Sequence, residues 1–159
     1  MTIKILLKFK IPSNKIRISD KCLFTGNFFG KNFVVLFQKE MTVPQIANRL
    51  AELCNQGDFE KAQRELFAED AISIEPYAST GFEKETKGLS AILEKGKKFN
   101  AMVEETHSCS VSNHILAGNA IALVLTMDVT MKGQERSKIA EICVYEVKDG
   151  KIISEQFFM

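Results

Sequence analysis

Long stretches of alternating apolar and polar residues fill the chain from Val103 to its end, and they constrain the fold more than any other feature of the sequence. The segments that join them are short and rich in Gly, Asn and Asp, residues that favour tight turns between antiparallel strands. The pattern predicts four long strands, at residues 103–111, 119–131, 136–147 and 151–159.

Residues 42–99 show helical spacing instead. A hydroxyl at Thr42 and a proline at Pro44 mark the start of a helix, and Gly57 marks its end. The predicted inner face of this helix comprises Ile46, Leu50, Leu53 and Cys54. Asp58 is expected to cap a second helix, with an inner face of Phe59, Ala62, Leu66 and Phe67. A third helix is predicted over residues 89–99, with its inner face at Leu89, Ile92 and Leu93.

Between the second and third helices, residues 71–76 read AISIEP. This stretch is predicted to form a short strand with Ile72 and Ile74 buried, followed by a polar loop at residues 77–87. Helices followed by a long run of strands are typical of α+β domains. We therefore expect N-terminal helices packed on a curved antiparallel sheet, forming a cone-shaped α+β barrel that encloses a pocket.

The charge is unevenly distributed along the chain. Residues 1–40 contain eight Lys or Arg against two acids, whereas residues 41–159 contain 13 Lys or Arg against 18 acids. A mildly acidic main domain argues against nucleic acid as a partner. No apolar run reaches the about 20 residues that a membrane-spanning helix needs, so no membrane partner is expected.

The four cysteines are widely spaced and form no paired motif. This spacing is typical of buried thiols in a reducing compartment, so we expect a cytoplasmic protein. The chain has only two histidines, and no metal site is expected. Residues 41–159 lack a nucleophile elbow, a phosphate loop and a dinucleotide fingerprint, so any chemistry is expected to be proton transfer without a cofactor.

The first forty residues differ from the rest in composition. Phe, Lys, Asn and Ile account for 21 of residues 1–40, but for only 31 of the 119 residues that follow. One hypothesis is that Met41 is the initiator and that residues 1–40 are a disordered leader or translated upstream sequence. The alternative is a basic targeting or membrane-surface arm, because residues 3–10 alternate basic and apolar side chains. N-terminal sequencing of the natural protein distinguishes the two.

Three segments, residues 53–76, 88–99 and 140–158, resemble a known group in their order and spacing. They are similar to the nuclear transport factor 2-like superfamily, and most closely to its SnoaL-like and ketosteroid-isomerase-like members. The resemblance spans residues 41–159. It implies a cone-shaped α+β barrel, often a homodimer, with an apolar cavity that takes a small apolar molecule.

The isomerase pattern also implies site residues. It places a carboxylate general base directly before a proline in the first short strand, a position that Glu75 occupies. It places a proton-holding carboxylic acid in the penultimate strand, where Glu141 lies. A phenol from the first helix usually completes the oxyanion hole. The matching position here is Leu50, so an apolar side chain stands in place of one of the two hydrogen-bond donors of the oxyanion hole. Leu50 is expected to contact the ligand instead.

The residues themselves support two interpretations of Glu75. A carboxylate inside an apolar cone loses hydration, which raises its pKa and makes it able to take protons from carbon acids. On this interpretation Glu75 is the general base. The alternative places it at the rim of the strand, paired with a surface lysine such as Lys84 or Lys87.

Glu141 shares one strand face with Ile139, Cys143 and Tyr145 by alternation. A carboxyl group among such neighbours is costly unless it is protonated or paired, and a protonated one can donate a hydrogen bond to an oxyanion. The alternative is an outward-facing acid paired with Lys138 or Arg136.

Four further residues are candidates. His107 is a possible general acid or base, since histidine titrates near neutrality, and a hydrogen-bonded wall residue is the alternative. Asp128 either points inward near the open end or is solvated on the far side of its strand. Tyr77 and Phe99 offer aromatic surface at the cavity mouth. Two functions stay open: an isomerase, cyclase or dehydratase acting on a small apolar carbonyl compound, or a non-catalytic ligand-binding or dimeric scaffold domain.

Overall fold

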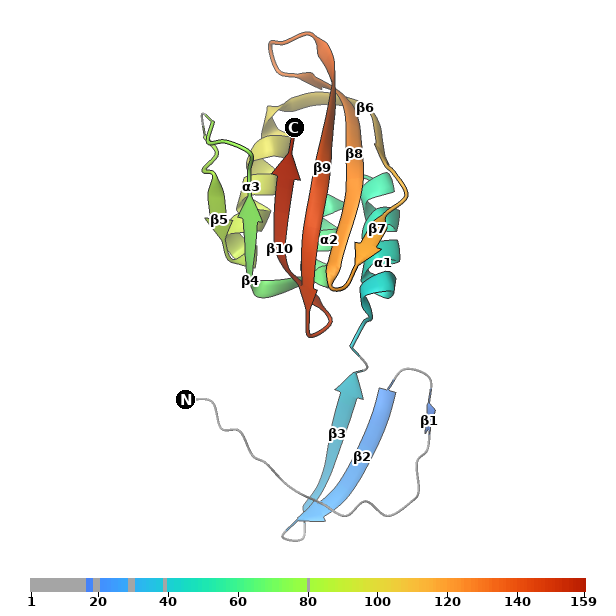
Figure 1. Cartoon of the computed structure of the whole chain (residues 1–159). Helices are drawn as coiled ribbons and strands as arrows, with labels where there is room; N and C mark the ends of the chain where they lie inside the picture. Colours follow the sequence, from blue (N-terminus) through green and yellow to red (C-terminus); the bar gives the residue numbers. More distant parts are fainter. Residues whose placement is uncertain (1–16, 19–20, 29–30, 39, 80) are drawn as a thin grey trace. The chain divides into compact units, whose positions relative to one another are not determined.

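The computed structural model of the chain describes residues 17–18, 21–28, 31–38, 40–79 and 81–159 (Figure 1). The backbone divides into two compact units, Met1–Lys39 and Glu40–Met159. In the first unit, three strands form an antiparallel sheet: β1 (Arg17–Ile18), β2 (Lys21–Phe28) and β3 (Lys31–Gln38). The origin of this segment, and the hypothesis that Met41 is the initiator, stay predictions.

The second unit contains the three predicted helices, α1 (Val43–Asn55), α2 (Phe59–Leu66) and α3 (Leu89–Met102). At the start of α1, the side-chain oxygen of Gln45 accepts a hydrogen bond from the backbone N–H of Thr42 at 2.8 Å, so it satisfies a donor next to the helix start. Asp58 directly precedes α2, but its side chain makes no capping hydrogen bond. Every apolar residue predicted for the inner faces of α1 and α3 is buried.

The sheet of this unit has the strand order β5-β4-β10-β9-β8-β6, and β7 pairs with β8. Neighbouring strands are antiparallel except for one parallel pair, β4 with β10. The strands are β4 (Phe67–Ile74), β5 (Glu85–Lys87), β6 (Val103–Val111), β7 (Ile115–Ala117), β8 (Ala120–Met131), β9 (Arg136–Lys148) and β10 (Lys151–Phe158). The two short strands β5 and β7 lie in segments predicted to be loops.

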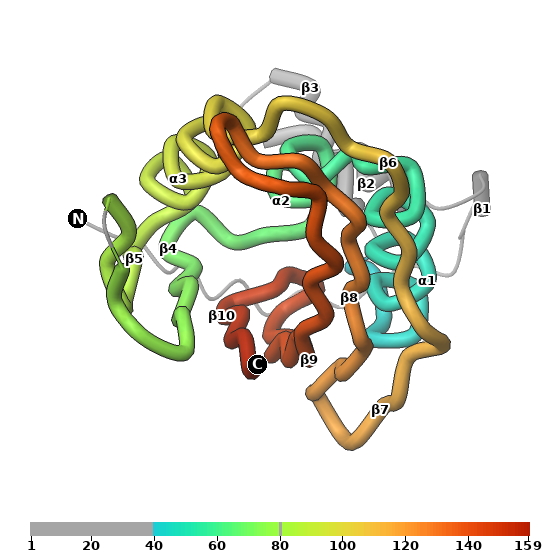
Figure 2. Tube along the Cα trace, turned by 90° about the horizontal axis from the view of Figure 1, so that it is seen from above, coloured from blue at the N-terminus to red at the C-terminus, as the bar shows by residue number. Residues whose placement is uncertain are grey.

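The helices lie in an arc on one side of the sheet, which curves and does not close on itself (Figure 2). Helix α1 packs against β6 and β8, and α3 packs against β4. The buried core lies between these layers and includes Ile46, Leu53, Leu66, Ile92, Ile121, Cys143 and Ile152. This is the predicted cone-shaped α+β fold. Among the residues that the structure describes, no helix is both long and apolar enough to cross a membrane.

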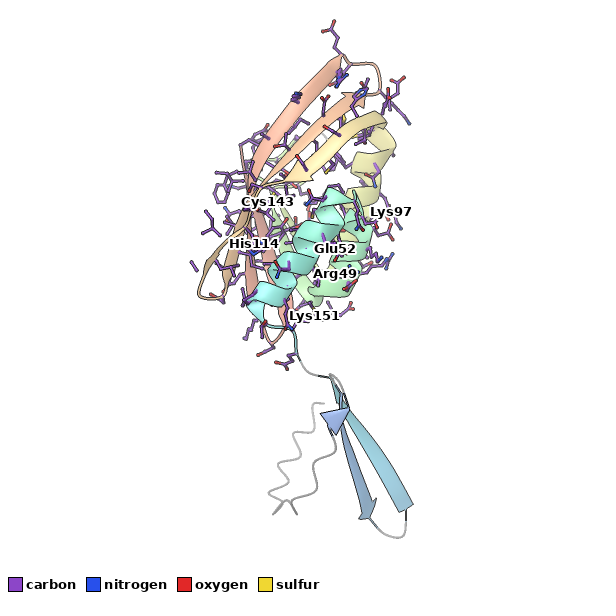
Figure 3. All side chains as sticks on the ribbon, turned by 90° about the vertical axis from the view of Figure 1, so that its right-hand side faces the viewer. Arg49, Glu52, Lys97, His114, Cys143 and Lys151 are labelled. Atoms are coloured by element: carbon purple, nitrogen blue, oxygen red, sulfur yellow. The ribbon has the colours of Figure 1, made fainter. Side chains whose placement is uncertain are left out.

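One arginine joins the first two helices on the surface. Arg49 of α1 donates two hydrogen bonds of 2.8 Å to the carboxylate of Glu65 in α2, and a third to Glu52 on its own helix. Figure 3 shows Arg49 and Glu52 as neighbours on this side of the domain. The guanidinium therefore contacts both carboxylate oxygens of Glu65, a two-point link between α1 and α2.

Candidate functional site

Strand β4 presents Glu75 to the interior of the cone. Ala71 and Ser73 are fully buried, whereas Ile72 and Ile74 are half-buried, so the prediction that these two isoleucines are the buried residues is wrong. At the end of β4, the inner face is the one formed by Ala71 and Ser73, and the isoleucines lie on the other face. Glu75 follows the strand on the odd-numbered side, and its side chain is 24% exposed.

Lys95 of α3 forms an ion pair with Glu75. Its Nζ atom lies 2.7 Å from Oε1 of Glu75 and 2.5 Å from Oγ of Ser73, and its side chain is only 14% exposed. A lysine this deeply buried is found almost only where its charge is paired. The partner therefore comes from the third helix and differs from the surface lysines considered as alternatives, Lys84 and Lys87.

Glu155 of β10 lies beside this ion pair. It is opposite Ser73 in β4 and Tyr145 in β9, and it is 4% exposed. Its Oε1 atom lies 4.0 Å from Nζ of Lys95 and has no hydrogen-bond partner among the described residues. Burial raises the pKa of Glu155, although a hydrogen bond with Ser73 and the charge of Lys95 oppose the rise.

Glu141 of β9 faces the same interior. It lies opposite Leu125 of β8, and it interacts electrostatically with Glu75, Lys95 and Glu155. Its pKa is raised from 4.5 to about 7, mainly by burial; the carboxylates of Glu75 and Glu155 contribute to the rise, and Lys95 opposes it. The alternative of an outward-facing acid does not apply, and Arg136, one of its proposed partners, pairs with another acid.

We refer to Ser73, Glu75, Lys95, Glu141 and Glu155 as the interior acid cluster. Its members come from α3, from three strands and from the residue directly after β4, so it exists only in the folded domain. Near neutral pH it combines a carboxyl group that is partly protonated with a carboxylate that is held in an ion pair. Such a set can both accept and donate a proton, which is the requirement for acid–base chemistry.

His107 and Asp128 belong to a different group of side chains. Nε2 of His107 lies 2.8 Å from Oγ1 of Thr130, and its Nδ1 lies 3.6 Å from Oε1 of Glu105. Both oxygens of Asp128 accept hydrogen bonds from Arg136, at 2.7 and 2.8 Å, and this contact lowers the pKa of Asp128. The structure therefore does not bring these two candidates together with the interior acid cluster.

The three apolar candidates lie in different environments. Leu50 is 2% exposed and packs in the hydrophobic core on α1. Phe99 is half-buried on α3. Tyr77 is 59% exposed in the loop after β4. Their ligand-binding roles stay predictions.

A surface hollow of about 480 Å³ lies away from these acids. The hollow is lined by the α1–α2 turn, by α2 and by one residue of α3. The lining residues are Gly57, Asp58, Phe59, Glu60, Lys61, Arg64, Glu65 and Asn100. The pocket predicted inside the cone stays a prediction. Across residues 40–79 and 81–159, no three or more His, Cys, Asp or Glu side chains are arranged to hold a metal ion.

Sequence reasoning missed Ser73, Lys95 and Glu155. Lys95 carried a usable signal, because it lies three residues after Ile92 and four before Phe99, on the inward stripe of α3. The sequence around Glu155 carried no signal that it would be buried. Strict alternation from the buried Ile152 would turn it outward, but the register of β10 shifts between residues 152 and 154 and brings it inward.

Solved structures share this fold. A protein from Mesorhizobium loti, described as a candidate SnoaL-like polyketide cyclase (carbohydrate phosphatase), is 34% identical, with 75% of this chain and all of that chain covered at a TM-score of 0.68. An NTF2-like protein of unknown function from Burkholderia pseudomallei is 15% identical, with 75% and 92% covered and a TM-score of 0.64. A ketosteroid isomerase-like protein from Catenulispora acidiphila, in complex with trimethylamine, is 17% identical, with 74% and 87% covered and a TM-score of 0.58.

A search of curated proteins finds no match to this chain. The model of the SnoaL-like domain family matches residues 41–159, which are the same residues as the second structural unit except for Glu40. The match covers well over half of the chain and includes every member of the interior acid cluster. The chain therefore belongs to the SnoaL-like domain family.

Proposed function

We propose that the interior acid cluster carries out acid–base chemistry without a cofactor on a small apolar carbonyl compound, in a reaction of the isomerase, cyclase or dehydratase type. One observation carries the proposal: the carboxyl group of Glu141, which has a pKa of about 7, interacts with the Glu75–Lys95 ion pair. The 34% identity to the protein described as a candidate polyketide cyclase supports a reaction of this class.

In the proposed reaction, Glu75 takes a proton from the carbon next to the carbonyl group. The electron pair of the broken C–H bond forms the C=C bond of an enolate, and the π electrons of the carbonyl group move to its oxygen. Protonated Glu141 donates a hydrogen bond to this oxygen as its negative charge develops. Lys95 holds the Glu75 carboxylate in place before the reaction. Return of the proton to a carbon or oxygen atom completes the isomerisation.

The test is proton exchange in heavy water, because it needs no knowledge of the natural substrate. NMR follows the loss of the protons next to the carbonyl group of 2-tetralone in the presence of the full chain. We expect exchange above the rate in buffer, and a loss of about 100-fold or more in Glu75→Gln, the usual contribution of a general base. The matched control is Glu69→Gln, an exposed acid on the same strand.

Equal exchange rates in the parent protein and Glu75→Gln would refute the proposal. Binding of 2-tetralone without any exchange would instead support a ligand-binding domain, the alternative considered from the sequence. Glu141→Gln separates the two roles further, because loss of the oxyanion donor is expected to slow exchange while the base stays in place.

We also propose that the domain forms a homodimer through the outer face of its sheet. Val124, Ile142 and Phe158 lie directly opposite one another on β8, β9 and β10, so they form one apolar row across three strands. These side chains are 38%, 49% and 45% exposed. A second copy, with the same row related by a two-fold axis, would cover this surface.

The proposed location is the cytoplasm. Cys54, Cys109 and Cys143 are free thiols, and burial raises the pKa of each one, which keeps them protonated and unreactive. Cell fractionation with an antibody against the chain tests the location, and recovery in a secreted fraction would contradict it.

A further inference from the structure

Glu155 is a deeply buried acid with one carboxyl oxygen that lacks a hydrogen bond in the described part of the chain. Its residue is 4% exposed, and its Oε1 atom makes no hydrogen bond within residues 40–79 and 81–159. Leaving a buried carboxyl oxygen without a partner costs folding free energy, and a ligand group that bonds to it would remove this cost. The atom lies on the inner face of the sheet, in the interior acid cluster.

Lys95 supplies the complementary group. An ammonium group has three N–H donors, and the hydrogen bonds to Glu75 and Ser73 use two of them. Its Nζ atom is 4.0 Å from Oε1 of Glu155, which is too far for a hydrogen bond between them. An oxygen atom about 2.8 Å from both would make an angle of about 90° with them, which hydrogen-bond geometry permits.

We infer that Glu155 and Lys95 form a subsite for a hydroxyl group of the ligand. The hydroxyl oxygen accepts the remaining N–H of Lys95, and the hydroxyl hydrogen is donated to Oε1 of Glu155. A hydroxyl suits this position better than a carbonyl or an ether, because only a hydroxyl both donates and accepts. The inference rests on the proposed function, since it assigns a second group of the ligand to the same interior. It narrows the ligand to an apolar molecule that carries an alcohol or enol.

The subsite is tested by comparing two probes that differ in one donor. Cyclohexanol and methoxycyclohexane are titrated into the isotope-labelled full chain, and amide NMR signals report binding. We expect cyclohexanol to bind at least about tenfold more tightly, because a hydrogen bond to a charged group contributes this much or more. The signals of Ser73, Lys95 and Glu155 should shift most.

Variants assign the preference to the subsite. Glu155→Met keeps the side-chain length but removes both oxygens, so the affinity ratio of the two probes should fall to about one. Gln156→Met is the matched control, because it places the same side chain on the opposite face of the same strand, and the ratio should stay unchanged. Should Glu155→Met fail to fold, Lys95→Met removes the other half of the subsite and should have the same effect.

Three results would overturn the inference: equal affinities of the two probes in the parent protein, strongest shifts outside the interior acid cluster, or no binding of either probe up to its solubility limit. These results are independent of the exchange experiment. Exchange of 2-tetralone without a preference for cyclohexanol would remove the hydroxyl subsite and leave the proposed chemistry intact. A preference for cyclohexanol without exchange of 2-tetralone would support the hydroxyl subsite and remove the proposed chemistry.

Discussion

The raised pKa of Glu141 makes a quantitative prediction about stability. In the folded protein the group holds its proton up to about pH 7, whereas in the unfolded chain it titrates near 4.5. The folded state therefore binds more protons between these two values, and the free energy of unfolding falls as pH rises through this window. The destabilisation is complete above pH 7 and largely absent near pH 5.

The size of the effect follows from the shift. A rise in pKa from 4.5 to about 7, at about 1.4 kcal/mol per pH unit, corresponds to ~3 kcal/mol. Because Glu141 is only half-buried, solvent screening reduces the expected value to ~2 kcal/mol. Glutamine has nearly the same shape and does not titrate. Glu141→Gln should thus raise the free energy of unfolding by ~2 kcal/mol at pH 8 and by about 0.5 kcal/mol at pH 5.

The assay is urea unfolding of the full chain at pH 5 and pH 8, with thermal melting as a second readout. For a domain of this size, ~2 kcal/mol corresponds to a rise in melting temperature of about 8 °C. The control is Glu146→Gln, an exposed acid on the same strand, which should change stability by less than about 0.5 kcal/mol at either pH. An equal effect of Glu141→Gln at both pH values, or a loss of stability at pH 8, would refute the reasoning.

Three further perturbations test other contacts. Lys95→Met leaves buried carboxylates without their cation, so urea unfolding should show a loss of about 1–3 kcal/mol that is larger at pH 8 than at pH 5; a pH-independent loss would contradict this. Ile142→Glu places a charge in the exposed apolar row, and light scattering should show a monomer where the parent is a dimer; a monomeric parent removes the dimer proposal. A methyl group at Gly150 would lie 2.9 Å from the side chain of Glu40, whereas one at Gly118 meets nothing within 4 Å. Both glycines have positive φ, so Gly150→Ala should cost ~1 kcal/mol more than Gly118→Ala in urea unfolding, and equal costs would exclude the contact.

The fold was predictable because its signals are local. The apolar spacing of α1 predicted its buried face, and the strands at residues 103–111 and 136–147 were expected within one residue of their observed bounds. The short strands were not predictable. Residues 115–117 have strand geometry because they pair with β8, and residues 85–87 because they pair with β4. Pairing of this kind depends on the tertiary structure and leaves little trace in three residues.

The site was only partly predictable, for a different reason. Glu75 and Glu141 were found from their place in a pattern, and both lie in the interior acid cluster. The orientation of Glu155 depends on one extra residue in β10, and no local propensity encodes such a shift. Lys95 was missed because a lysine in a helix is ordinarily solvated, and only its ion pair with Glu75 makes its burial favourable.

The parallel pairing of β4 with β10 also determines when the interior acid cluster can form during synthesis of the chain. Ser73 and Glu155 face each other across this pair, although about eighty residues separate them in the chain. The ribosome delivers the N-terminal part first, so the helices and β4 are present long before the strand that carries Glu155. A chain without β10 therefore has Glu75 and Lys95 but not the complete interior acid cluster. Removal of β10 should therefore abolish the proton exchange proposed for this cluster.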